Sequence, residues 1–185
     1  MNRSTESASR DIVVRTHRIA SDTAGIELQL LNKHGADHDA FSPTRTLVIM
    51  HGATFSSASL FDVAVGGASF MDVLASAGFD VWAFDARGYG GSARPSEMDR
   101  SADNGAPLTR TETAARDLAS AVEFVCRHRG IDRTSVLGMS WGGSVAGIYA
   151  GRNGGRVEKL ALVAPLWLSA TPLRIDGGGP MSRCS

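Results

Sequence analysis

Short, continuously apolar runs alternate with helical patterns along most of this chain. The runs cover residues 46–50, 80–84, 134–139 and 159–163. None of them shows the apolar and polar alternation of a half-buried strand, so each is typical of a strand buried on both faces of a parallel sheet. The helical patterns between and after the runs cover residues 70–77, 111–129 and 141–152. This alternation predicts an α/β fold, a mostly parallel sheet with helices on both faces.

Two further strands are predicted before these runs. Residues 12–19 and 26–31 are rich in apolar residues, and a turn-rich segment at residues 21–25 separates them. Strands joined by so short a connection pair antiparallel. Residues 34–43 are expected to form a loop. One antiparallel pair should therefore lie beside the parallel strands.

The start of the longest helix, at residues 111–129, can be predicted from its flanking residues. Thr109 and Glu112 have the spacing of a capping box, and Leu118 and Val122 fall on one face. No internal repeat or second domain is evident. We expect a disordered N-terminus at residues 1–11, a core of six strands at residues 12–168 and an irregular tail at residues 169–185.

The third apolar run ends in Gly138-Met139-Ser140-Trp141-Gly142, a Gly-x-Ser-x-Gly pattern at a predicted strand-to-helix junction. The bare pattern arises by chance in a chain rich in Gly and Ser, so its setting has to support it. A sharp turn here would lift the Ser140 hydroxyl clear of the sheet, and the two glycines would leave room for the turn and the helix after it. Ser140 is therefore the predicted nucleophile.

A segment after the first apolar run offers groups that could stabilise negative charge. His51-Gly52-Ala53-Thr54 opens the first irregular loop, at the same sheet edge as Ser140. An attacked carbonyl develops an oxyanion, and losing one donor to it typically costs about 100-fold to 1000-fold in rate. The backbone N–H groups of Ala53 and Trp141 are the predicted donors.

Together these features resemble the α/β-hydrolase family over roughly residues 15–168. The segments that carry the resemblance are His51-Gly52, Asp85-Ala86-Arg87-Gly88-Tyr89-Gly90-Gly91-Ser92, the Gly138 to Gly142 elbow and Ala161-Leu162-Val163-Ala164-Pro165. The resemblance implies a serine hydrolase that transfers an acyl group to water, on a carboxylic ester, without a cofactor. It also implies that Asp85 and Arg87 brace loops and that His51 orients the oxyanion turn.

In this family the catalytic acid and then the histidine follow the serine along the chain. All five histidines of this sequence lie at or before His128, and the acids after Ser140 are Glu158 and Asp176. Asp176 precedes three glycines and receives little weight as the catalytic acid. We therefore expect a C-terminally incomplete hydrolase domain, nearly inactive as given, whose sixth strand is an uncovered apolar edge.

Several alternatives remain open. The Gly-x-Ser-Trp-Gly elbow is similar to that of proline iminopeptidases, so an amide substrate competes with an ester. A non-catalytic fragment that binds a small ligand in the same cleft is the rival outside enzymes. Nineteen basic and nineteen acidic residues cancel, which disfavours nucleic acid as a partner, and no run is long enough to span a membrane. The two cysteines and five histidines show no metal-ligand spacing. A cytoplasmic protein is expected, with its oligomeric state undetermined.

Overall fold

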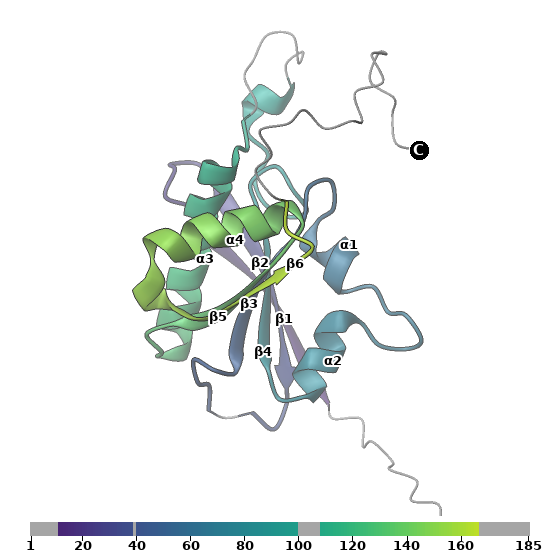
Figure 1. The fold of residues 1–185 in the computed structure, drawn as a ribbon. Helices are drawn as coiled ribbons and strands as arrows, with labels where there is room; N and C mark the ends of the chain where they lie inside the picture. The colour runs from purple at the N-terminus through teal and green to yellow at the C-terminus, as the bar shows by residue number, and fades with distance from the viewer. Residues whose placement is uncertain (1–10, 39, 100–107, 167–185) are drawn as a thin grey trace, which may run out of the picture.

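The computed structural model describes residues 11–38, 40–99 and 108–166, which form a single six-stranded sheet with helices on both faces (Figure 1). The predicted disordered N-terminus and irregular tail fall almost wholly outside these residues. The strands are β1 Ile12–Ala20, β2 Glu27–Gly35, β3 Thr46–Met50, β4 Asp80–Asp85, β5 Thr134–Met139 and β6 Val157–Val163. Their order across the sheet is β1-β2-β4-β3-β5-β6.

Strand direction divides the sheet in two. β1 pairs antiparallel with β2, and β2 pairs antiparallel with β4. From β4 onward all pairings, β4 with β3, β3 with β5 and β5 with β6, are parallel. The predicted α/β fold with a mostly parallel sheet is confirmed. Because β3 and β5 are neighbours, the loops that leave their carboxyl ends meet at one edge of the sheet.

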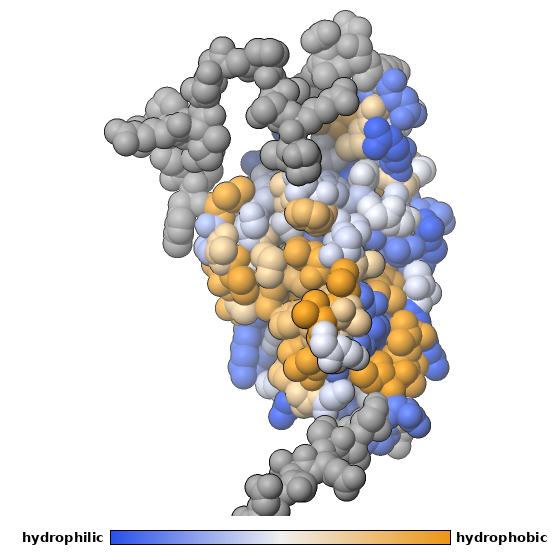
Figure 2. Space-filling model, turned by 90° about the vertical axis from the view of Figure 1, so that its right-hand side faces the viewer, coloured by the Kyte–Doolittle hydropathy of each residue, from blue (hydrophilic) through white to orange (hydrophobic). Residues whose placement is uncertain are grey.

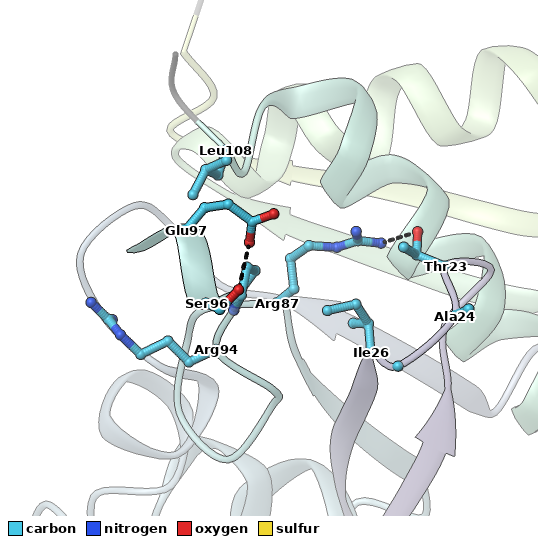
Figure 3. A pocket seen from close by; sticks show the side chains of 10 residues that line it. Thr23, Ala24, Ile26, Arg87, Arg94, Ser96, Glu97 and Leu108 are labelled. Carbon is cyan, nitrogen blue, oxygen red and sulfur yellow. Dashed lines mark hydrogen bonds between the residues drawn. The ribbon is translucent and has the colours of Figure 1, made fainter. Parts of the chain in front are cut away.

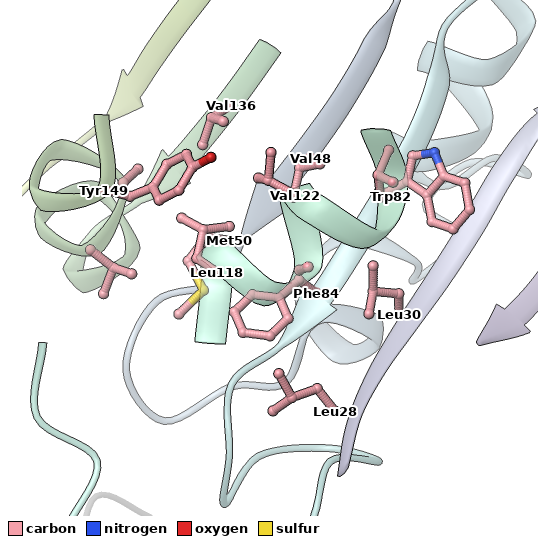
Figure 4. Close-up of a cluster of buried hydrophobic side chains, with 14 of the residues drawn as sticks. Leu28, Leu30, Val48, Met50, Trp82, Phe84, Leu118, Val122, Val136 and Tyr149 are labelled. Carbon is pink, nitrogen blue, oxygen red and sulfur yellow. The ribbon is translucent and has the colours of Figure 1, made fainter. Parts of the chain in front are cut away.

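The helices form two unequal layers. α3 (Thr111–Arg129) and α4 (Trp141–Arg152) cover one face, whereas the shorter α1 (Ser57–Phe61) and α2 (Phe70–Ser76) cover the other (Figure 1). The larger core lies under α3, where Leu118 and Val122 pack against side chains of β2, β3 and β4 (Figure 4). Every residue of β3 and β4 is buried, as their continuous apolar runs predict.

The structure corrects three local predictions. β2 continues to Gly35, into the segment predicted as loop, and α1 lies inside a segment predicted to be irregular. The predicted capping box is wrong. α3 has Arg110 as its N-cap, without a side-chain cap, so Glu112 is one position too early for the box. The Thr109 hydroxyl instead donates to the Arg87 carbonyl, 3.2 Å away.

The two edge strands differ in chemistry. On β1, Arg15, Thr16 and Arg18 are exposed. Charged side chains on an edge strand disfavour its pairing with a strand of another chain. On β6, Leu160, Leu162 and Val163 are each about 40% exposed, at 40%, 43% and 41%. Figure 2 shows apolar side chains gathered on the surface of the molecule. The predicted apolar sixth-strand edge is thus present among the described residues.

No helix in the described part of the chain combines the length and apolarity needed to cross a bilayer.

Candidate active site

Ser140 occupies the junction between β5 and α4 in a backbone conformation that residues with a side chain rarely adopt. Its φ is 53° and its ψ is −121°. The Ser140 N–H donates to the Val163 carbonyl at 2.9 Å, and the Ser140 carbonyl accepts from the N–H of Gly143 at 2.9 Å and of Leu166 at 3.3 Å. These bonds hold the strained turn, because such a conformation persists only where its surroundings over-determine it.

The two elbow glycines permit this turn by different close approaches. A methyl group on Gly138 would overlap the Gly142 carbonyl oxygen and lie 2.6 Å from the Gly142 carbonyl carbon. A methyl group on Gly142 would overlap the His51 carbonyl oxygen and lie 2.6 Å from that of Met50. Gly142 therefore also lets α4 approach the end of β3, a close contact that the sequence did not predict.

The segment after β3 lies directly beside Ser140. Gly52 is buried, and a methyl group on it would lie 3.2 Å from Ser140 Cβ and 3.7 Å from Ser140 Oγ. The next two residues, Ala53 and Thr54, are exposed, and Thr54 has a φ of 79°. A β-branched residue in the left-handed region is strained. The fold thus places Gly52, which precedes the predicted donor Ala53, beside Ser140, whose chain neighbour Trp141 carries the other predicted donor.

His51 is fully buried at the base of this turn, and both of its ring nitrogens are engaged. Nε2 accepts the Ala86 N–H at 3.2 Å, so Nδ1 carries the proton and donates to the Gly52 carbonyl at 2.6 Å. Burial lowers the pKa of His51, although the Gly52 hydrogen bond and the Asp85 charge oppose the shift. A neutral ring with both nitrogens occupied orients the turn and offers no free base to Ser140.

Asp85, at the end of β4, holds two loops. One carboxylate oxygen accepts the Ser57 N–H at 2.8 Å, which fixes the start of α1. The other accepts the Gly91 N–H at 3.0 Å and fixes the loop after β4. Its neighbour Arg87 forms a buried ion pair with Asp117 of α3. The bracing roles implied for Asp85 and Arg87 fit these contacts.

An aromatic group, which we define as His51, Tyr89 and Trp141, joins the loops after β3 and β4 to the start of α4. The ring centroids of His51 and Tyr89 are 4.6 Å apart, and the Trp141 ring lies 6.0 Å from Tyr89 and 6.3 Å from His51. The Trp141 indole N–H donates to the Thr111 hydroxyl at 3.1 Å. Sequence reasoning missed Thr111, because nothing in the local pattern distinguishes it from any threonine in the first turn of a helix.

Within the described residues, no hydrogen bond joins the Ser140 hydroxyl to a histidine. His17 and His128 pack against Trp82 instead, and His34 packs against Phe41. Nor do the described residues gather three His, Cys, Asp or Glu side chains that could hold a metal ion. In the part of the chain that the structure describes, the arrangement thus presents the Ser140 hydroxyl beside the Gly52 turn, and no histidine is hydrogen-bonded to that hydroxyl.

A separate hollow of about 500 Å³ opens between the β1–β2 turn and the segment after β4 (Figure 3). Its lining includes Thr23, Ile26, Arg87, Arg94 and Leu108 and none of the three predicted site residues. The Arg87 guanidinium donates to the Thr23 hydroxyl at 3.0 Å and is already paired with an acid. This hollow is therefore held by a structural ion pair.

Comparison with solved structures finds the same fold in several hydrolases. A bacterial membrane phospholipase A superposes with a TM-score of 0.61 and 24% identity, over 84% of this chain and 41% of its own. A probable hydrolytic enzyme from Pseudomonas aeruginosa gives 0.58 and 25%, over 83% and 42%. Epoxide hydrolase A from Mycobacterium thermoresistibile gives 0.56 and 21%, over 81% and 39%. The chain thus spans about two fifths of the length of these relatives.

No curated protein matches this chain. A family model described as the alpha/beta hydrolase fold matches residues 45–176, which is more than two thirds of the sequence and includes the Ser140 elbow and the His51 turn. Strand order, elbow geometry and this match agree, and the chain belongs to the α/β-hydrolase fold family.

Proposed function

We propose that this chain carries the nucleophile and the oxyanion hole of a serine hydrolase that cleaves carboxylic esters by acyl transfer to water. The observation that carries the proposal is the strained Ser140, with a φ of 53°, directly beside the Gly52 turn. Strain of this kind is retained where it presents a reactive group. A serine that merely began a helix would have extended backbone and cap the helix, whereas Ser140 makes no side-chain cap bond.

In the proposed reaction, Ser140 Oγ attacks the ester carbonyl carbon and its proton passes to a base. The carbonyl oxygen becomes an oxyanion that accepts hydrogen bonds from the N–H groups of Ala53 and Trp141. The N-terminus of α4 adds favourable partial positive charge. The tetrahedral intermediate then expels the alcohol, which takes up a proton, and water hydrolyses the acyl-enzyme. No step requires a cofactor.

The base that accepts the Ser140 proton is proposed to lie outside the described residues. His51 is occupied at both nitrogens, and its lowered pKa reflects burial rather than a carboxylate partner. Without a base, oxyanion stabilisation alone leaves a residual rate enhancement of about 10³-fold to 10⁴-fold over water in serine proteases. The chain by itself should therefore acylate slowly.

Covalent capture by a fluorophosphonate tests the proposal. The full chain is incubated with excess reagent, and intact and peptide mass spectra record the adduct with time. We expect slow, single labelling of the peptide that contains Ser140, no labelling of Ser140→Ala, and unchanged labelling of Ser120→Ala in α3. Free imidazole should accelerate capture, because it supplies the absent base.

A non-catalytic, ligand-binding role is the competing proposal. It is favoured because no histidine among the described residues is hydrogen-bonded to the Ser140 hydroxyl. If this role is right, fluorophosphonate should label the wild-type chain no faster than it labels Ser140→Ala, with or without imidazole. That result would contradict the hydrolase proposal.

A further inference from the structure

The side chain of Trp141, the residue after the proposed nucleophile, is held by contacts with several other segments. Its indole N–H donates to the Thr111 hydroxyl at 3.1 Å, across 30 residues of chain. Its ring contacts the rings of Tyr89 and His51, which belong to the loops after β4 and β3. The indole is half-buried. A side chain held in this way restrains the backbone to which it is attached.

The backbone in question is the peptide that joins Ser140 to Trp141. Its orientation is set by the Ser140 ψ of −121° and by the φ of Trp141, and it carries the N–H proposed as an oxyanion donor. The strained turn would relax if this peptide could rotate. Catalytic donors are effective only when they are held toward the developing charge before it forms. Fixing the indole therefore fixes the direction of the donor.

We propose that Thr111 is a positioning residue of the oxyanion hole. Its hydroxyl holds the Trp141 indole, and through it the strained Ser140–Trp141 peptide, in the orientation that receives the oxyanion. The inference rests on the proposed acyl-transfer function. It assigns to the first residue of α3 a role in a site formed by β5 and α4.

The Thr111 hydroxyl is not needed to begin its own helix. The N-cap of α3 is Arg110, and α3 is anchored by its buried apolar face and by the Asp117 ion pair with Arg87. Replacing Thr111 by valine keeps the shape and removes the acceptor, which leaves the indole N–H without that partner. Replacing it by serine keeps the hydroxyl. Thr113→Val makes the same chemical change two residues along, on a different side of α3.

The experiment compares these three variants with the wild-type full chain. The saturating rate and the half-saturating concentration of fluorophosphonate capture are measured together with the indole ¹⁵N–¹H spectrum, in which Trp141→Phe identifies the Trp141 signal. For Thr111→Val we expect a shifted, faster-exchanging Trp141 signal and a saturating rate lowered about threefold to tenfold. The half-saturating concentration should not change, because orientation of the donor acts on the transition state.

Thr111→Ser should restore both the signal and the rate, and Thr113→Val should alter neither. The inference is overturned if Thr111→Val shifts the indole signal yet labels at the wild-type rate, or if Thr113→Val slows labelling as much. It is also overturned if the indole signal does not respond to Thr111→Val. A wild-type chain labelled no faster than Ser140→Ala would reject the proposed function itself, and the inference with it.

Discussion

Asp117 of α3 is the acid on which three segments of the fold depend. Its side chain is fully buried and accepts from Arg87 Nε at 2.8 Å and Arg87 Nη2 at 2.5 Å. It also accepts the Ser21 hydroxyl at 2.9 Å. The pKa of Arg87 is raised, first by the hydrogen bond with Asp117, against the opposing effect of burial. The pair joins α3 to the β1–β2 turn and to the loop after β4.

Asp117→Ala should therefore destabilise the fold strongly. The side chains of Arg87 and Asp117 are only 8% and 0% exposed, so the small energies of surface ion pairs do not apply. Removing one partner of a buried pair leaves an uncompensated charge and costs about 3–5 kcal/mol. That loss is comparable to the whole stability of a marginal domain, which is about 5 kcal/mol at the low end.

Urea denaturation followed by circular dichroism measures this effect. The matched control is Arg116→Ala, which breaks the exposed pair with Asp22, and it should cost less than about 1 kcal/mol. The double variant Arg87→Met with Asp117→Leu should recover much of the loss, because no buried charge remains. The reasoning is refuted if Asp117→Ala unfolds at the same urea concentration as Arg116→Ala, or if the double variant is no more stable than Asp117→Ala.

Three further outcomes are expected. Gly138→Ala should lower stability by about 1–3 kcal/mol in urea and slow Ser140 capture, since its methyl group meets backbone; wild-type behaviour would contradict the elbow geometry. Burial, and then the like charges of neighbouring His128 and two arginines, lower the pKa of His17 below 6.5. The unfolded chain therefore binds more protons, and the free energy of unfolding should fall from about pH 7 to about pH 5, with a smaller slope in His17→Phe. If the free energy of unfolding of His17→Phe depends on pH as steeply as that of the wild type, His17 is not a source of the dependence. The exposed apolar residues of β6 predict that the chain self-associates, and Leu162→Lys should reduce this association in sedimentation, whereas Val14→Lys on β1 should not. An equal effect of the two substitutions would contradict the role of β6.

The sequence predicted the parallel strands and long helices well because their signals are local. The apolar run of residues 46–50 became β3 with those bounds, since its composition tolerates burial on both faces. The elbow was predicted for the same reason, because its two glycines and Ser140 lie within five consecutive residues. The capping box failed because α3 has Arg110 as its N-cap, and the Thr109 hydroxyl donates to the Arg87 carbonyl, a contact that no local pattern reveals.

The sequence by itself determined the order of strands and helices, and which hydroxyl stands at the strand-to-helix turn. Tertiary structure decided which distant residues surround the turn that carries that hydroxyl. It placed Gly52 against Ser140, engaged both nitrogens of His51, and brought Thr111 to the Trp141 indole. The physical reason is that periodicity and turn preference act over a few residues, whereas hydrogen bonds between loops depend on strand order and on how closely the helices pack.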